Sequence, residues 1–292
     1  MAVGVLILGE SGTGKTYSIK SFPAEDVKIL SVAKPVLPFR GKYDMVRTPD
    51  AESVIREMKN TRKKNIVVDD FQYILGLPMM RRIGEKGWDK FNDIEQGYSD
   101  VLDALNDLPE DTIVYLNSHI ETDENGRRKI KTVGKALDKY ITIEGLFMVV
   151  LGTEVVDNHY YFVTQNSGND TVKSPEGMFP SKYIPNDLKY VEDKIRNYYY
   201  MTGAKTDDEI SAEDKEKAVA DEEVKPERKP RRRQADKELS EYVDKVNEAV
   251  DKAAGDREEV PIDEVPEVEA PDPEPEKPVE EAPKRRTRRT RN

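Results

Sequence analysis

A lysine and a threonine follow a glycine-rich turn near the start of the sequence. Residues 9–16 read GESGTGKT, which has the spacing G-x-x-x-x-G-K-T of a phosphate-binding loop. Glycines permit backbone torsions that are closed to other residues, so consecutive N–H groups can point at phosphate oxygens. We therefore expect Lys15 to contact the β- and γ-phosphates as a catalytic cation, and the Thr16 hydroxyl to bind Mg²⁺. The alternative is a chance glycine-rich turn.

The segments on either side of this loop fit a nucleotide site. The apolar run Val3–Leu8 predicts a buried strand that leads into the loop. A helix expected from about Lys15 would add its unpaired N-terminal amides and the positive end of its dipole. The sequence therefore predicts ATP and Mg²⁺ as cofactors. The predicted nucleotide-binding residues are Gly9, Glu10, Ser11, Gly12, Thr13, Gly14, Lys15, Thr16 and Tyr17.

Two aspartates end a second apolar run. The segment NIVVDDFQYI, Asn65–Ile74, has the pattern of a Walker B strand. A carboxylate at the C-terminal edge of such a strand lies beside the phosphates, so Asp69 is expected to help hold Mg²⁺. Asp70 stands where many ATPases carry a glutamate that polarises the attacking water, which makes it a candidate base. It could equally cap a turn or a helix.

Polar residues also end a third apolar run, TIVYLNSH, at Thr112–His119. Asn117, Ser118 and His119 suit a sensor that hydrogen-bonds the γ-phosphate or the attacking water. Asn117 and His119 are the candidate catalytic residues of this group. A capping role for all three is the alternative.

The remaining periodic segments indicate the fold. Further strands are predicted at VKILSV, YDMVRT, LFMVVLG and HYYFVTQ, and helices at 51–62 and 88–108. Strands that alternate with helices indicate an α/β fold with a mostly parallel central sheet flanked by helices.

Composition separates this core from the C-terminal region. Hydrophobic and charged residues each make up 36% of the 292 residues, a low and a high share for a wholly globular chain. After about residue 202, charged residues, proline and alanine replace most aliphatic and aromatic side chains, too few of which remain to bury a core. We predict a P-loop core at 1–202 and a largely disordered tail at 203–292, with one amphipathic helix at 235–254. A solubilising extension is the simplest role for the tail.

The composition also excludes several classes. The chain has no cysteine, which excludes disulfides, thiol catalysis and thiolate metal sites. No apolar run approaches the length of a signal peptide or a membrane span, so we expect a cytoplasmic protein without membrane contact. The net charge of −11 argues against broad nonspecific affinity for nucleic acids, although a local basic face remains possible.

The phosphate loop, IVVDD and IVYLNSH, at these intervals, resemble the core of the RecA-like ATPases. The later segment GNDTVKSPEGMFP, residues 168–180, is similar to phage-encoded ATP-binding proteins of single-strand annealing and recombination. The resemblance covers about residues 1–185. It implies a Mg²⁺-dependent ATPase that acts in phage DNA recombination, annealing or replication in the host cytoplasm. One departure is that KILSVAKPVL lacks the acidic residue often found at the end of the second strand, which leaves Asp70 as the base, or a slow or defective hydrolysis step.

The resemblance also implies where DNA would bind. In RecA-like recombinases, single-stranded DNA lies on loops after the Walker B and sensor strands, which correspond here to residues 76–90 and 121–135. Both segments are rich in cations, and Trp88 could stack on a base. The DENG turn in the second segment suits a hairpin tip. A solvated surface is the alternative for either segment. The candidate DNA-binding residues are Arg81, Arg82, Lys86, Arg127, Arg128 and Lys129.

Assembly and partners follow from the same resemblance. RecA-like ATPases place their nucleotide at a subunit boundary, which implies a homo-oligomer. Lys173, in TVKSP, is the candidate cation donated to a neighbour's site, and a surface lysine is the alternative. Single-stranded DNA and a single-strand-binding protein are the implied partners.

Two other classes of protein stay open. A kinase for a nucleotide or metabolite uses the same loop, with mobile arginines that close over the phosphates. A nonhydrolysing, nucleotide-switched adaptor would recruit partners through the tail, and the missing second-strand carboxylate favours it. Phosphorylation of a nucleoside or metabolite on incubation with ATP would favour the kinase, and a phosphate-release assay would discriminate the adaptor. ATP turnover with and without single-stranded DNA is the most informative single experiment.

Overall fold

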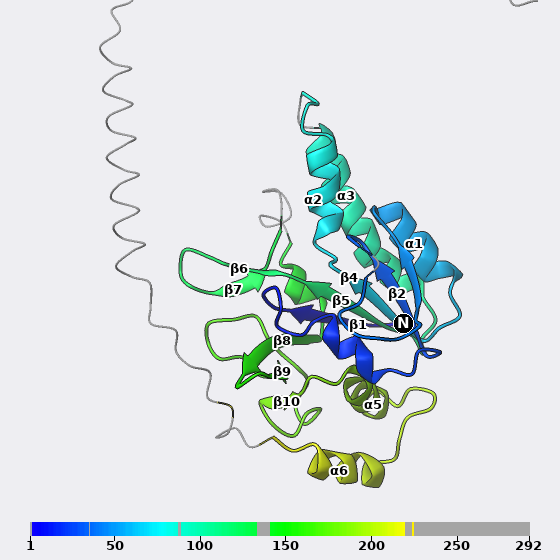
Figure 1. Ribbon diagram of the computed structural model, residues 1–292, viewed down its shortest axis with the longest axis vertical. Coiled ribbons are helices and arrows are strands. Elements are labelled where there is room, and N and C mark those ends of the chain that lie inside the picture. The colour runs from blue at the N-terminus through cyan, green and yellow to red at the C-terminus, as the bar shows by residue number, and fades with distance from the viewer. Residues whose placement is uncertain (1, 35, 87–88, 133–140, 220–223, 225–292) are drawn as a thin grey trace, which may run out of the picture. The chain divides into compact units, whose positions relative to one another are not determined.

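The structure is a computed structural model that describes residues 2–34, 36–86, 89–132, 141–219 and 224. It confirms the predicted fold class, because helices flank both faces of a mostly parallel sheet (Figure 1). The strands are β1 (Val3–Leu8), β2 (Val27–Ser31), β3 (Asp44–Arg47), β4 (Asn65–Asp69), β5 (Ile113–Ser118), β6 (Ile120–Thr122), β7 (Arg128–Ile130), β8 (Val149–Val156), β9 (His159–Val163) and β10 (Tyr183–Pro185). The α-helices are α1 (Ala51–Asn60), α2 (Tyr73–Arg81), α3 (Asp89–Ala104), α5 (Leu188–Tyr198) and α6 (Asp207–Glu216), and the 3-10 helices are η1 (Tyr17–Ser21), η2 (Leu105–Asp107) and η3 (Ile143–Leu146).

The strand order of the main sheet is β10-β9-β8-β1-β5-β4-β2-β3. All neighbours from β8 to β3 are parallel, and the pairs β8–β9 and β9–β10 are antiparallel. Strand β5 follows β4 in the sequence but lies between β1 and β4. Because parallel strands end at the same edge of a sheet, this order brings the C-terminal ends of β1, β5 and β4 side by side.

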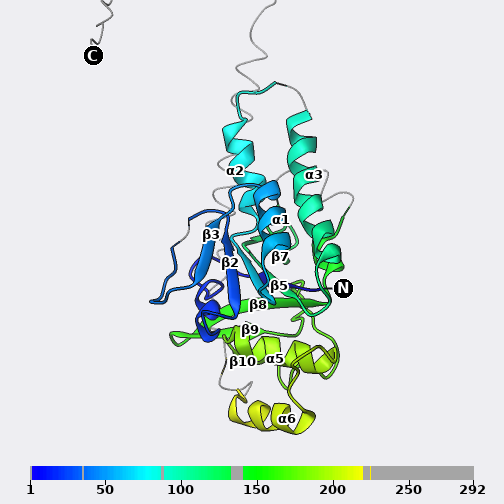
Figure 2. The same cartoon turned by 90° about the vertical axis from the view of Figure 1, so that its right-hand side faces the viewer.

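Alternating side chains of β1 enter two separate cores. Leu6 and Leu8 belong to the core that includes side chains of α1, α2 and α3, whereas Val5 and Ile7 belong to the core that includes η1 and α5. Figure 2 shows α1, α2 and α3 on one side of the sheet and α5 on the other. A strand buried on both faces has no polar face, which explains the unbroken apolar run before the phosphate loop.

The helix expected from about Lys15 is much shorter than predicted. Only the five-residue 3-10 helix η1 follows the phosphate loop. Phe22 is extended, with φ of −74° and ψ of 141°, because the following Pro23 disfavours helical torsions at the residue before it. Bound phosphates would therefore meet the loop amides and Lys15 rather than the dipole of a long helix.

Two packed helices contain the two ends of the loop predicted at 76–90, and the described residues 82–86 follow the first of them. Helices α2 and α3 lie side by side in both views (Figures 1 and 2), and α2 continues through Pro78. Lys90 belongs to α3, and its Nζ donates to backbone carbonyls of the turn that follows α2, including that of Glu85 at 2.6 Å. Lys90 thus ties the turn after α2 to the start of α3 instead of facing a DNA strand. Trp88 lies outside the described residues.

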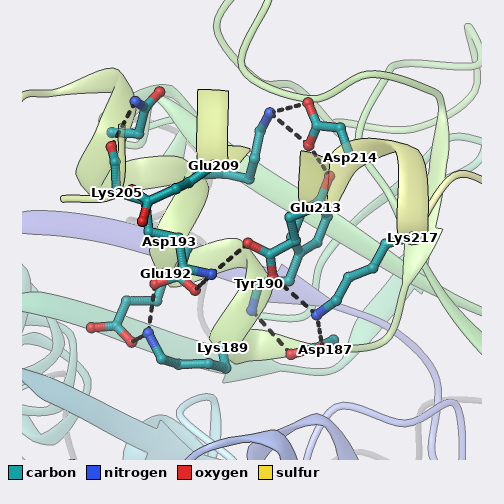
Figure 3. A network of polar contacts seen from close by, with 12 residues as sticks. Asp187, Lys189, Tyr190, Glu192, Asp193, Lys205, Glu209, Glu213, Asp214 and Lys217 are labelled. Atoms are coloured by element: carbon teal, nitrogen blue, oxygen red, sulfur yellow. Dashed lines mark hydrogen bonds and ion pairs between the residues drawn. The ribbon is translucent and has the colours of Figure 1, made fainter. Parts of the chain in front are cut away.

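The folded chain extends beyond the boundary predicted at residue 202. Helix α6 begins at a capping box and joins α5 through a network of ion pairs and hydrogen bonds (Figure 3). Lys194 of α5 lies 2.8 Å from Asp214 of α6, and the Tyr190 hydroxyl donates to the same carboxylate at 2.6 Å. Ile210 of α6 is buried. The helix predicted at 235–254 lies outside the described residues.

Truncation of the chain after Gly203 is expected to lower the Tm by about 5–10 °C relative to truncation after Arg228. The shorter chain loses α6, and with it the Lys194–Asp214 ion pair, the Tyr190–Asp214 hydrogen bond and the burial of Ile210, a loss of roughly 2–4 kcal/mol. Thermal unfolding followed by circular dichroism measures the difference. Equal Tm values for the two truncated chains would mean that α6 does not stabilise the core.

Candidate nucleotide-binding site

The phosphate loop takes the backbone shape that its glycines allow. Gly12 and Gly14 have φ of 82° and 101°, a region that residues with a side chain rarely enter. Gly9 lies against β8, because a Cβ at this position would stand 1.8 Å from the Thr153 hydroxyl. The hydroxyl groups of Thr13 and Thr153 are 2.5 Å apart. Strand β8 therefore supports the loop.

The Lys15 ammonium is buried inside the loop and donates to the carbonyls of Gly9 and Glu10 at 2.8 and 2.7 Å. Burial lowers the pKa of Lys15 to about 8, and the carboxylates of Asp70 and Asp69 act in the opposite direction. An anion brought to the loop would favour the charged form of the lysine. Lys15 is therefore placed to bind a phosphate once it exchanges these carbonyl partners.

Thr16, Asp69 and Asn117 meet at the C-terminal edge of the sheet. The Thr16 hydroxyl lies 3.0 and 3.1 Å from the two Asp69 carboxylate oxygens, and the Asn117 amide donates to Asp69 Oδ1 at 2.8 Å. Strand β5 makes this possible, since it carries Asn117 between the loop and β4. Burial raises the pKa of Asp69, while the hydrogen bonds from Asn117 and Thr16 oppose that shift. The structure thus brings together three residues predicted from separate segments.

This cluster has the donor types that Mg²⁺ prefers. Thr16 and Asp69 supply a hydroxyl and a carboxylate, and the neighbouring Asn117 Oδ1 is buried without a hydrogen-bond partner in the described part of the chain. No group of three or more His, Cys, Asp or Glu side chains that could hold a metal occurs among the described residues. A Mg²⁺ ion would therefore take most of its ligands from phosphate and water, as it does at other nucleotide sites.

Asp70 and His119 face each other beside this cluster. Asp70 has φ of 60°, in the left-handed region that aspartate enters more readily than most residues. Its Oδ1 lies 3.5 Å from His119 Nε2. The His119 ring also makes an edge contact with Tyr73. Both side chains of the pair are partly exposed, so water and a ligand can reach them.

Two polar residues at this edge are missing from the sequence-based predictions. The Gln72 side-chain oxygen accepts hydrogen bonds from the Ser118 hydroxyl and the His119 amide at 3.3 and 3.2 Å, which ties the segment after β4 to the end of β5. Thr153 holds the phosphate loop. The rule that identified Asp69, a polar side chain directly after an apolar run, would also have found Thr153 after VVLG.

The segment predicted at 121–135 forms the hairpin β6–β7 with its turn at DENG, as expected, and its last three residues lie outside the described structure. It starts directly after His119. Arg127 is exposed at the turn. Arg128 and Lys129 each face a carboxylate, at 3.6 and 3.1 Å. These cations are therefore partly neutralised within the chain.

The other predicted cations lie in different settings. Arg82 pairs with Glu85 and Asp93 at 2.8 and 3.0 Å inside the α2–α3 hairpin, whereas Arg81 and Lys86 are exposed near its end.

Lys173 is paired through its backbone with Val150 of β8, at 2.8 and 2.9 Å. Its role in the site of a neighbouring subunit stays a prediction.

Comparisons with known proteins place few limits on the function. No protein-family model matches the sequence, and no curated protein matches it. Among solved structures, the chain is similar to a KaiC-like protein from the hyperthermophilic archaeon Pyrococcus horikoshii. The two share 13% sequence identity, the match covers 63% of this chain and 84% of that chain, and the TM-score is 0.39, a similarity too distant to carry function. None of the described helices combines the length and hydropathy that a membrane crossing requires.

Proposed function

We propose that this protein binds and hydrolyses ATP in the presence of Mg²⁺. The observation that supports the proposal best is the convergence of Thr16, Asp69 and Asn117 beside the buried Lys15. Burial of an ammonium or a carboxylate is costly unless the charge is paired and hydrogen-bonded. A Mg²⁺-bound triphosphate would pair both charges, since its phosphates offer an anion to Lys15 and its metal ion offers a cation to Asp69.

Each side chain has a distinct role in this proposal. The loop amides and Lys15 bind the phosphates and oppose the charge that develops during phosphoryl transfer. Thr16 and Asp69 would hold Mg²⁺, which supplies charge neutralisation at the phosphate oxygens. Asn117 orients the Asp69 carboxylate through its hydrogen bond.

Asp70 is the proposed acceptor for the proton of the attacking water. Its contact with His119 directs the carboxylate. Strand β2 ends at Ser31, so the strand beside β4 supplies no acidic residue at this edge. Because aspartate reaches one methylene less far than glutamate, we expect slow turnover.

Phosphate release from ATP by the full chain tests the proposal. We expect release that requires Mg²⁺ and stops on addition of a chelator. Tight ATP binding without release would instead favour the nucleotide-switched adaptor. Transfer of phosphate to an added nucleoside or metabolite would favour the kinase. A chain that binds no ATP would overturn the proposal.

We also propose single-stranded DNA as a ligand, with a role in recombination or annealing. Support comes from the hairpin β6–β7, which begins directly after His119 and presents Arg127 and Arg128 on its surface. DNA on this hairpin could therefore act on the Asp70–His119 pair. A homo-oligomer that shares its nucleotide sites through Lys173 belongs to the same proposal.

Replacement of Arg127 and Arg128 by glutamine is expected to weaken single-strand binding and to flatten its salt dependence. Each lost phosphate contact should reduce the slope of log affinity against log salt by roughly 0.7. Fluorescence anisotropy of labelled oligo(dT) over a KCl series measures this slope.

The control replaces Arg82 and Lys59 by glutamine, since Lys59 pairs with Asp107 at 2.8 Å. Arg82 is already committed to two carboxylates, so this variant should change the slope less. An unchanged slope in the Arg127 and Arg128 variant would remove the hairpin from the DNA path.

A further inference from the structure

An unpaired side-chain amide lies against the phosphate loop. Asn186 follows β10, and both its Oδ1 and its Nδ2 are buried without a hydrogen-bond partner among the described residues. A Cβ added to Gly14 would lie 3.1 and 3.2 Å from these two atoms, so the amide packs on the last glycine of the loop. A buried amide without partners destabilises a protein, which calls for an explanation beyond packing.

Two tyrosine rings lie at the same place. Tyr160 of β9 also packs on Gly14, since its Cδ1 would stand 2.8 Å from a Cβ there. The ring centroids of Tyr160 and Tyr17 are 5.1 Å apart, and the ring planes are inclined by 34°. Both tyrosines are partly exposed. Tyr17 follows Thr16 directly, whereas Tyr160 lies in β9 and Asn186 directly follows β10.

We propose that Tyr160 and Asn186, together with Tyr17, recognise the nucleobase of the bound nucleotide. The inference rests on the proposed ATP binding, because phosphates held in the loop fix where the nucleoside can lie. Aromatic rings stack on the flat face of a base. A side-chain amide has a donor and an acceptor side by side, which complements the adjacent donor and acceptor on the edge of adenine.

Binding of the base requires a local rearrangement. Both amide atoms are buried in the ligand-free chain, so the Asn186 side chain must rotate, or the ring of Tyr17 or Tyr160 must shift, before a base can reach them. The competing explanation is that Asn186 only supports the phosphate loop. The two explanations predict different effects of removing the Asn186 amide. If Asn186 recognises the base, its removal weakens binding only of a ligand that carries a base. If Asn186 supports the loop, its removal weakens binding of any ligand whose phosphates occupy the loop.

Calorimetric titration with Mg²⁺–ATP and with Mg²⁺–tripolyphosphate separates these explanations. For Asn186→Leu we expect about 10-fold weaker ATP binding and unchanged tripolyphosphate binding. The Tm of the ligand-free variant should not fall, because leucine removes a buried unpaired amide. Tyr160→Ala should show the same selective loss of about 10-fold, and Tyr160→Phe, which keeps the ring, should bind ATP like the wild type.

Several results would overturn the inference. An equal loss of affinity for both ligands in Asn186→Leu would make Asn186 a support of the loop. Unchanged ATP affinity in both Asn186→Leu and Tyr160→Ala would remove the two residues from the site. Wild-type binding of tripolyphosphate as tight as that of ATP would mean that no base is recognised. Failure of the wild type to bind either ligand would instead disprove the proposed ATP function on which the inference rests.

Discussion

Replacement of Lys15 by alanine is expected to weaken Mg²⁺–ATP binding about 100-fold while the chain stays folded. A charge-assisted hydrogen bond contributes roughly 1.5–3 kcal/mol, and an ammonium between two phosphates makes more than one. In the ligand-free protein Lys15 contacts two carbonyls of its own loop, and burial lowers its pKa. Its removal should therefore leave the free energy of unfolding nearly unchanged. Calorimetric titration and thermal unfolding measure the two quantities.

The exposed Lys42 provides the control for this prediction. Lys42→Ala loses the same charge at an exposed position outside residues 9–16 and should bind ATP like the wild type. If Lys15→Ala bound ATP with wild-type affinity, the phosphate-loop assignment would be wrong.

Replacement of Asp69 by asparagine is expected to lower Mg²⁺-dependent turnover by at least about 100-fold. The variant should fold, because the Asn117 amide can still donate to a side-chain oxygen at position 69. What it loses is the negative charge that faces Thr16 and would attract Mg²⁺. Steady-state phosphate release over a Mg²⁺ series should show that half-maximal activity needs more metal.

Asp70→Asn makes the same chemical change one residue later and so serves as the matched variant. Asp70 contacts His119 rather than Thr16, so this variant should keep its ATP affinity and Mg²⁺ dependence and lose mainly kcat. Full activity in both variants would contradict the Walker B assignment. A changed Mg²⁺ dependence in Asp70→Asn alone would exchange the proposed roles of the two aspartates.

The polar residues at the strand ends of the site were predictable, because the pattern that identifies them involves only residues adjacent in the sequence. An apolar run that stops at a polar residue identifies both Asp69 and Asn117, and parallel pairing then brings the two together. Tyr160 and Asn186 escape this rule. Tyr160 lies inside a strand, and Asn186 reaches the loop from β10, so tertiary packing alone shows that both touch Gly14.

Three further differences from the sequence-based predictions also have physical causes. Pro23 ends the helix after the phosphate loop early. The loop expected at 76–90 comes from the resemblance to RecA-like recombinases, whereas here packing against α3 stabilises α2, which continues through Pro78. The contacts of α6 are mostly between charged groups. A boundary drawn from composition reads such charged residues as a solvated tail, which is why it falls too early, at residue 202.

The central position of β1 has a consequence for how the chain folds. Val3 pairs with Ile113 and Val5 with Val149, so the first strand gains its neighbours only after most of the core has been synthesised. Contacts so distant in sequence slow folding, because long chain segments must be closed before they form. The phosphate loop is synthesised first, but it lacks its supporting contact with β8 until Thr153 has been synthesised and packed against it. Under the proposed function ATP would bind only the finished sheet, so it should slow unfolding and protect against proteolysis without accelerating folding.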